Sequence, residues 1–382
     1  MIQREQSALI RPISIVLGYV MDFFFNSTVF FTVANSLGIS IILLTIVTRL
    51  LMLPLSFNSQ KSMSAMKKVQ PEMEAIKKKY GDSTDPEVKQ KMNREIQALY
   101  SKHKVNPFGG CLPMLIQMPI FFALNYMMQH TYMFIKSLGE IYYELADLLL
   151  RIPNRFNYLL PLVQPKVPNN IMADGFDISQ ADDLVRALNR FSQQDWQDLL
   201  YKTPQELGID RFPLPPGETE WLSYLVSIPQ EFVYEISMLL AEKQSIEFFF
   251  GINLKDISGW AFPGILIPIL TTATMFLSSW LMTKQQPPAE GQAKMTQQLM
   301  TYGLPVFFGF TTASFAAGVG VYWVVSTIFQ IFQQMYLVKY FEKKEGKKEA
   351  IIEDKKAGEI KMIEDKAVDD KRGARNRKQK KE

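Results

Sequence analysis

The stretch SIILLTIVTRLLMLPL, residues 40–55, is almost entirely apolar and contains one arginine, Arg49. A helix that crosses the hydrocarbon core of a bilayer needs about 20 mostly apolar residues. An ionised arginine in such a segment costs roughly 2.5–3.5 kcal/mol, even on the more lenient insertion scale. The stretch therefore predicts a membrane span whose one charge needs water or a polar partner.

Further apolar stretches follow along the chain. The last one, 297–338, is too long for one span, and Gly318, Gly320 and the polar run Thr311–Ser314 predict a tight reversal inside it. We therefore expect an all-α integral membrane protein with five transmembrane helices. These helices are expected at 32–55, 107–134, 259–283, 297–312 and 314–338.

The charges between the spans predict the orientation, because lysine and arginine concentrate on the cytoplasmic side. Residues 56–106 hold 11 Lys/Arg against 6 acids, and the tail 339–382 holds 16 against 11. The segment 135–258 has the opposite balance, with 10 Lys/Arg against 18 acids. The N-terminus and 135–258 are thus expected outside, and 56–106, 284–296 and 339–382 inside.

The first 31 residues predict an external tail and an amphipathic helix at the outer interface. Within 12–26, one helical face is apolar, while Ser14, Gly18 and Asp22 lie off it. The apolar face consists of Ile13, Val16, Leu17, Val20 and Phe24. An uncleaved signal-like segment is the alternative interpretation.

Residues 56–106 predict a cytoplasmic coiled-coil hairpin. Apolar residues recur at spacings of three and four on both sides of the sequence GDSTDP, where Asp85 can cap the second helix and Pro86 suits its first position. The stripes are Met66, Val69, Met73, Ile76 and Tyr80, then Met92, Ile96 and Leu99. A solvated connector and a docking arm for a ribosome, translocase or incoming chain remain equally open.

The segment 135–258 predicts an external helical cap insertion, with helix-like pieces at 138–152, 180–201 and 219–247. It shows no catalytic constellation, so a structural lid is favoured over an active site. The tail 339–382 predicts a basic, disordered cytoplasmic segment. Lipid headgroups and ribosomal RNA both offer phosphates to such a tail, and the sequence does not choose between them.

Composition excludes several kinds of chemistry. The single cysteine, Cys111, excludes an intramolecular disulfide and a cysteine-cluster metal site. The two histidines, His103 and His130, are too few and too far apart for a zinc motif. No phosphate-binding loop and no hydrolase or metalloprotease motif occurs. We therefore expect no enzyme, no cofactor and no metal.

Polar residues from several spans predict a site around Arg49. Thr45 and Ser56 share its helical face, and Gln117 is an amide within the second span. The fifth span carries Tyr322, Trp323, Ser326 and Gln330 at helical spacing. The alternative is that Arg49 snorkels to the cytoplasmic end of its helix, about 9 Å away by helix rise.

Several motifs resemble the YidC-type membrane protein insertases, which are related to the Oxa insertases of mitochondria. They are TRLLMLPL, the hairpin KSMSAMKKVQPEMEAIKKKY, VNPFGGCLPMLIQMPIF and LPVFFGFTTASFAAGVGVYWVVST. The resemblance covers about 30–134 and 248–340, and the run NPFGGCLPMLIQMPI is the most specific part. Residues 135–247 are not covered, because this loop is usually short in the family.

The resemblance implies five spans around a hydrophilic groove that is open to the cytoplasm and closed outside. Arg49 matches the groove arginine, which is expected to attract acidic residues in the short tail of an incoming membrane protein. Thr45, Gln117, Tyr322, Trp323 and Ser326 match positions that line or neighbour the groove. A glutamine often found at the end of the third core span is replaced here near Ser278 or Ser279.

The resemblance also implies partners and a location. Nascent membrane proteins are the expected substrates, with the ribosome, the Sec translocase and targeting machinery, and membrane lipids as further partners. The location is a bacterial plasma membrane, multi-pass, with the N-terminus outside and the C-terminus cytoplasmic. The chain resembles the five-span type of Gram-positive bacteria, although no cysteine near its N-terminus permits lipidation.

Two other functional classes remain to be weighed. A secondary transporter or channel for a small anion could use Arg49 as its binding site, but such proteins usually contain internal repeats, and none is found in this sequence. A membrane enzyme lacks a candidate nucleophile, base or metal cluster. Selective uptake of small anions into liposomes would favour the transporter over the insertase.

Overall fold

A computed structural model describes nine stretches of the chain, and the account below is limited to them. They are residues 10–29, 34–81, 85–106, 109, 112–152, 156–167, 175–201, 230–284 and 292–344. Residues 345–382 of the predicted tail 339–382 lie outside these residues, as do most of the predicted external tail, most of the predicted loop 284–296, and 202–229. Residues 339–344 belong to the last helix, Ala317–Lys344, so a disordered segment beginning at 339 is not confirmed. The chain divides into two units: Met1–Met52 with Pro113–Phe329, and Leu53–Leu112 with Gln330–Glu382.

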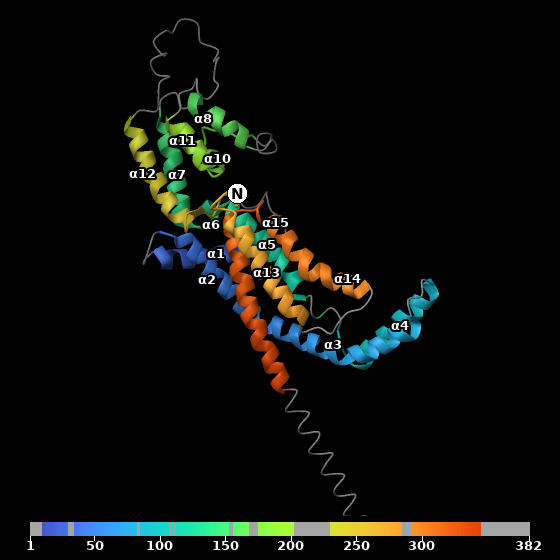
Figure 1. Ribbon diagram of the computed structural model, residues 1–382. Helices are drawn as coiled ribbons and strands as arrows, with labels where there is room; N and C mark the ends of the chain where they lie inside the picture. The colour runs from blue at the N-terminus through green and yellow to red at the C-terminus, as the bar shows by residue number, and fades with distance from the viewer. Residues whose placement is uncertain are drawn as a thin grey trace, which may run out of the picture. The chain divides into compact units, whose positions relative to one another are not determined.

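The first unit is almost entirely helical (Figure 1). Its first helices are α1 (Ile10–Val29), α2 (Ser36–Leu51), α5 (Leu112–Gln129), α6 (Thr131–Phe134), α7 (Lys136–Arg151) and α8 (Phe156–Val163). Next come η1 (Gln164–Lys166), α10 (Ala181–Leu188), α11 (Gln193–Tyr201), α12 (Gln230–Glu247) and α13 (Leu266–Lys284). The helical run α14 (Gln292–Gln298), η3 (Leu299–Gly303) and α15 (Leu304–Thr312) precedes the last helix, Ala317–Lys344.

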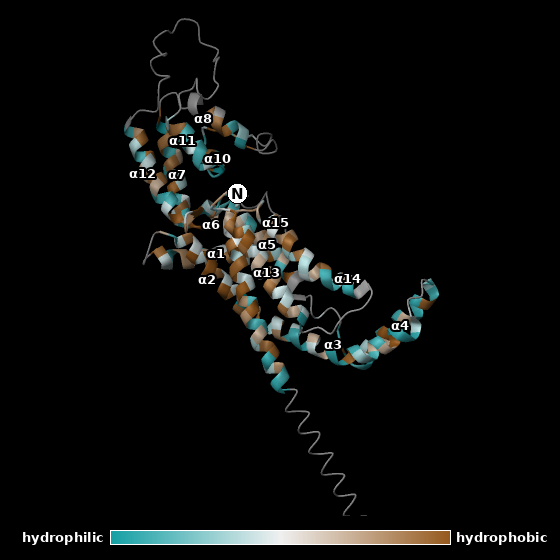
Figure 2. Ribbon diagram, in the orientation of Figure 1, coloured by the Kyte–Doolittle hydropathy of each residue, from teal (hydrophilic) through white to brown (hydrophobic). Residues whose placement is uncertain are grey.

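Three described helices are long and apolar enough to cross a membrane: α1, α13 and the last helix. A fourth is added if α2 and the following helix are taken as one span. Apolar residues dominate α13 and the upper part of the last helix in Figure 2. The prediction of an all-α integral membrane protein is therefore confirmed, and the count of five spans stays a prediction.

Helix α1 buries a different face from the apolar face expected from the sequence. Its buried residues include Ser14, Gly18 and Phe25, whereas Val16 is 61% exposed. Gly18 explains the difference, because a Cβ at this position would lie 2.4 Å from the ring of Phe134. Small residues let the helix approach its neighbours closely, as is common in membrane helices.

Helix α2 is shorter than the predicted span. It ends at Leu51, where Met52 forms the C-cap, and α3 (Leu53–Tyr80) follows. Ser56 therefore lies on α3, and the expectation that it shares a helical face with Arg49 is wrong. The polar residues that α2 buries beside Arg49 are Thr45 and Thr48.

Helices α13 and α15 pack closely against one another. A Cβ at Gly309 of α15 would lie 1.7 Å from the hydroxyl oxygen of Thr272 on α13. Farther along, the hydroxyls of Thr283 and Thr301 lie 2.6 Å apart. Helix α13 begins at Leu266, seven residues after the start of the predicted span, because residues 258 and 259 form backbone hydrogen bonds with the reversal before the last helix.

The described residues of the acidic segment 135–258 are mostly helical, as the sequence predicts. Helices α7, α8, α10, α11 and α12 gather at one end of the first unit (Figure 1). A short antiparallel hairpin follows α12, with β1 (Phe248–Phe249) paired to β2 (Ile252–Asn253). This hairpin and α8 were not expected, and residues 219–229 of the helix predicted at 219–247 lie outside the described residues.

The second unit contains the predicted helical hairpin of α3 (Leu53–Tyr80) and α4 (Pro86–Lys102). Asp85 caps α4 by accepting a hydrogen bond from the backbone N–H of Glu87, with Pro86 at the first position, as the sequence predicts. Val69 and Leu99 belong to its small buried core. Ion pairs on the surface also join the two helices, including Lys79–Glu95 at 2.8 Å.

Gly309→Ala is expected to destabilise the contact between α13 and α15, because the added methyl group would overlap Thr272. Overpacking of this kind typically costs about 1–3 kcal/mol. Thermal unfolding in detergent should show a lower midpoint for Gly309→Ala, and the double change Gly309→Ala with Thr272→Ala should recover part of the loss. An equal midpoint for Gly309→Ala and the wild type would contradict this close approach.

Candidate functional site

Arg49 lies in the last turn of α2 and points toward the last helix. Its Nε donates a hydrogen bond of 2.7 Å to Oγ of Ser326, 277 positions later in the sequence. The arginine is half-buried and Ser326 is fully buried. The guanidinium is thus bound by another helix, which differs from the snorkelling geometry that the sequence left open.

A second polar contact joins the last helix to α5. Nε2 of Gln117 donates to the hydroxyl of Tyr322 at 2.6 Å, and Tyr322 is 2% exposed. Tyr322 lies one helical turn before Ser326 on the last helix, so the two polar contacts are neighbours. Three helices that are far apart in the sequence therefore contribute to one polar group: Arg49 from α2, Gln117 from α5, and Tyr322 with Ser326 from the last helix.

Two of the six predicted site residues have other contacts. The hydroxyl of Thr45 is fully buried and donates to the carbonyl of Ile41 within α2, at 2.6 Å. Trp323 stacks on Phe121 with ring centroids 4.8 Å apart and meets Phe308 edge-on at 4.9 Å. Thr45 thus completes the hydrogen bonding of its own helix, and Trp323 packs helices together.

The sequence missed the aromatic partners of Trp323. Phe121 and Phe308 lie in apolar runs, where one phenylalanine looks like the next, so no local signal separates them from lipid-facing residues. Thr48 was missed as well, although it follows Thr45 by three residues, a spacing that places both on one face of a helix. It is buried and donates to the carbonyl of Leu44 at 2.7 Å.

The chemistry that this group can perform is anion binding. A guanidinium carries five N–H donors and binds carboxylates in a planar, two-point geometry. Ser326 accepts a hydrogen bond from one of these N–H groups, Nε of Arg49. Charge pairing with Arg49 would be stronger than in water, because the effective dielectric constant is lower near buried sites. Within the described residues, no group of three or more His, Cys, Asp or Glu could hold a metal ion.

Comparison with known proteins identifies one family. A sequence model of the family described as "60Kd inner membrane protein" matches residues 29–164 and 224–345. These ranges cover more than half of the chain and include Arg49, Gln117, Tyr322 and Ser326. The match extends farther into the acidic segment 135–258 than the motifs suggested and leaves 165–223 of it unmatched.

Individual relatives carry the name "Membrane protein insertase YidC". One from Anaeromyxobacter dehalogenans (strain 2CP-C) is 50% identical over 130 residues, which is 34% of this chain and 22% of the relative. Another from Caulobacter vibrioides (strain NA1000 / CB15N) is 28% identical over 314 residues, which is 82% of this chain and 35% of the relative. The chain therefore spans about a third or less of the length of these relatives.

The contact between Gln117 and Tyr322 is expected to contribute measurably to stability. A double-mutant cycle with Gln117→Leu and Tyr322→Phe should give a coupling energy of about 1 kcal/mol, as found for other hydrogen bonds between membrane helices. Denaturant unfolding in mixed micelles provides the measurement. The matched control pairs Thr45→Val with Tyr322→Phe and should give a coupling near zero, since Thr45 bonds within its own helix. Equal coupling in both cycles would contradict the assignment.

Proposed function

Because this chain belongs to the 60Kd inner membrane protein family, which includes the YidC insertases, we propose that it inserts and chaperones membrane proteins. It receives short polar tails of nascent membrane proteins, often acidic, in a hydrophilic groove open to the cytoplasm. It then releases the substrate helix into lipid, either alone or together with the Sec translocase.

One observation carries this proposal: a cation within an apolar helix is held by the side chain of another membrane helix. Arg49 donates a hydrogen bond to Ser326, and Tyr322, one turn away on the same helix, accepts one from Gln117. Ionisable residues within membrane spans commonly face a bundle interior or a watery cavity and mark a functional path. The bond from Arg49 to Ser326 supports such a site and argues against simple snorkelling.

The mechanism needs no separate energy source. A water-filled groove shortens the apolar distance that a polar tail must cross. Arg49 pairs with an acidic group of the tail, and Ser326, Tyr322 and Gln117 orient the arginine and supply further polar contacts. Burial of the substrate helix in lipid and the membrane potential acting on an acidic tail then drive net transfer. A groove closed at its outer end would prevent ion leakage.

The remaining predicted residues have supporting roles in this proposal. Thr45 adds a polar side chain to the buried face of α2 near Arg49, and its hydroxyl is already hydrogen-bonded to the carbonyl of Ile41. Trp323, packed between Phe121 and Phe308, fixes the last helix against α5 and α15. The exposed apolar faces of α5 and the last helix, including Phe122 and Ile328, would guide the substrate helix toward lipid.

The proposed topology is multi-pass in a bacterial plasma membrane, with five spans, the N-terminus outside and the C-terminus in the cytoplasm. The hairpin of α3 and α4 would then stand in the cytoplasm, where it could receive the incoming chain or its targeting machinery. The basic tail 339–382 would bind the ribosome or anionic lipid. The segment 135–258 would form a cap on the outer face.

A transporter for small anions is the competing function, since the same arginine could bind such an ion. Selective, saturable uptake of a small anion into liposomes that contain the purified chain would refute the insertase proposal. Absence of uptake, with insertion activity in the same vesicles, would support it.

Arg49→Ala is expected to reduce insertion of a single-span protein with a short acidic tail. The rate into liposomes should fall about tenfold, which corresponds to about 1.4 kcal/mol of lost interaction. Arg49→Lys should retain a substantial part of the rate, because it keeps the charge. A protected-fragment assay at constant protein density provides the measurement.

Two controls make this result specific. Arg151→Ala removes an exposed arginine that pairs with Asp147 on the surface of α7 and should leave the rate unchanged. A substrate whose tail carries no acidic residue should be less sensitive to Arg49→Ala than the acidic one. Full activity of Arg49→Ala with the acidic substrate would refute the role of the charge.

A further inference from the structure

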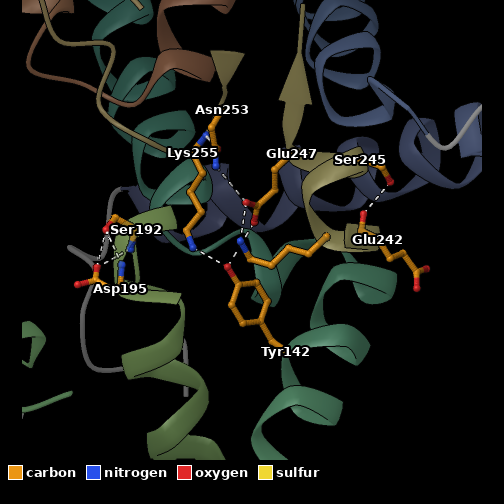
Figure 3. Close-up of polar contacts among 9 residues, drawn as sticks. Tyr142, Ser192, Asp195, Glu242, Ser245, Glu247, Asn253 and Lys255 are labelled. Atoms are coloured by element: carbon orange, nitrogen blue, oxygen red, sulfur yellow. Dashed lines mark hydrogen bonds and ion pairs between the residues drawn. The ribbon is translucent and has the colours of Figure 1, made fainter. Parts of the chain in front are cut away.

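A buried cluster of charged and polar side chains lies where α12 meets the β1–β2 hairpin (Figure 3). Nζ of Lys243 and Oε2 of Glu247 are 2.7 Å apart, and the two side chains are 6% and 0% exposed. The hydroxyl of Tyr142, from α7, donates to Oε1 of Glu247 at 3.3 Å. Nζ of Lys255, beyond β2, donates to the same hydroxyl at 2.6 Å.

The cluster joins three pieces of the external segment through one aromatic ring. The ammonium groups of Lys243 and Lys255 lie 5.5 and 5.0 Å from the centre of the Tyr142 ring. Nδ2 of Asn253 adds a long contact of 3.4 Å to Glu247. Glu247 is thus the acceptor on which α7, α12 and the strand β2 converge, as Figure 3 shows.

Next to this cluster, the chain pairs with the outer end of the last helix. The N–H of Ala317 donates to the carbonyl of Asp256 at 2.8 Å, and the N–H of Gly318 donates to that of Leu254 at 2.7 Å. These are among the first N–H groups of the last helix, which have no partner within the helix itself. The N–H of Leu254 in turn donates to the carbonyl of Glu247 at 3.0 Å.

The same region also holds the outer end of α2. The N–H of Asn35 donates to the carbonyl of Ser245 at 3.1 Å, and Oδ1 of Asn35 accepts from the N–H of Phe250 at 3.2 Å. Gly38 lies so close to Phe249 that an added Cβ would overlap its ring. The residues around Glu247 therefore contact the first residues of both α2 and the last helix. These are the two helices that the Arg49–Ser326 hydrogen bond joins.

We propose that Glu247, with Lys243, Tyr142 and Lys255, is a positioning device that fixes the outer ends of α2 and the last helix, so that Ser326 and Tyr322 remain opposite Arg49 and Gln117. Ser326 follows Ala317 by nine residues in one continuous helix, about 13 Å by helix rise. A rotation or shift at Ala317 is therefore transmitted to Ser326. The inference rests on the proposed function only for its effect on insertion.

The cluster also makes this device sensitive to pH. Burial lowers the pKa of the Lys255 ammonium from 10.5 to about 7, and the Glu247 carboxylate offsets only part of this effect. The other charged groups that face Lys255 are Lys243, Asp256 and Arg190. Between pH 7 and 10.5 an opened cluster binds one proton more than the closed one, so a rise in pH favours the closed cluster.

The Glu247 carboxyl and the Tyr142 phenol have pKa values that are shifted away from the range between pH 7.5 and 9. Burial opposes ionisation of Glu247, but Lys243 and Lys255 together hold the pKa of its carboxyl below the ordinary value. Burial raises the pKa of the partly buried Asp256 from its ordinary acidic value. Burial also raises the pKa of Tyr142 well above 10. Lys255 is therefore the group expected to govern opening in this range.

The test is hydrogen exchange of the full chain in nanodiscs, comparing Glu247→Gln with Glu242→Gln. Glu242 is an exposed acid on the same helix, so its replacement removes the same charge without touching the cluster. Glu247→Gln should accelerate exchange at Ala317 and Gly318 about tenfold or more, as expected for local opening. Glu242→Gln should leave the exchange rates of these two amides within about twofold of the wild type. Equal exchange in the two variants would overturn the proposal.

Two further variants guard against simple misfolding. Tyr142→Phe keeps the ring and removes only the bridging hydroxyl, so it should accelerate the same amides by a smaller factor while α13 remains protected. Lys255→Gln should abolish the pH dependence of the protection factors at Ala317 and Gly318. In the wild type these factors should rise with pH between 7.5 and 9, by at most about tenfold per pH unit. A wild-type slope that persists in Lys255→Gln would overturn the assignment to Lys255.

Insertion assays then connect the cluster to the proposed function. Glu247→Gln should slow insertion of the acidic-tail substrate, whereas Arg49→Ala should slow it without accelerating exchange at Ala317 and Gly318. If Arg49→Ala leaves insertion intact, the proposed function fails, and the exchange data still decide whether the cluster fixes the helix ends. If exchange accelerates in Glu247→Gln and insertion does not slow, the positioning role is refuted.

Discussion

The structure depends on how a positive charge is accommodated inside an apolar helix. Arg49 cannot be left in hydrocarbon without a polar partner, and its partner, Ser326, comes from the far end of the sequence. This one hydrogen bond requires α2 and the last helix to lie beside one another. Gln117 and Tyr322 extend the requirement to α5. The polar group therefore constrains which helices can be neighbours.

A second set of charges inside the first unit, around Glu247, has the same need for polar partners. Glu247 and Lys243 are almost completely removed from solvent, and a buried charge is tolerated when it is paired and hydrogen-bonded. The pairing includes Tyr142 and Lys255, so it also fixes α7 and β2. The acidic segment 135–258 thus becomes an ordered support for the first turns of α2 and the last helix.

Elsewhere in the first unit, helices are held together by close packing at small residues. Gly18 meets Phe134, and Gly309 meets Thr272, at distances that leave no room for a side chain. Without a hydrophobic driving force between helices in lipid, close packing of this kind is a major source of association. It also explains why the small residues Ser14 and Gly18 lie on the buried face of α1, together with Met21 and Phe25.

The sequence by itself determined the all-α membrane class, the helical hairpin with its Asp85 cap, and the candidate residues around Arg49. These follow from local properties: apolar length, 3.6-residue periodicity, capping chemistry and the cost of an isolated charge. Motif resemblance added the family. The helix boundaries were less accurate, as Ser56 shows, because apolar length predicts one span through Leu55, whereas Pro54 removes a backbone N–H and favours an interruption just before it.

Only the tertiary structure decided which candidates meet. Arg49 pairs with Ser326 and Gln117 with Tyr322, whereas Thr45 bonds within its own helix and Trp323 packs on Phe121 and Phe308. The Glu247 cluster was not visible either, because its members are spread over 114 positions, from Tyr142 to Lys255. Periodicity shows which face of a helix a side chain occupies, but the partner across the interface is set by three-dimensional packing, which local sequence does not encode.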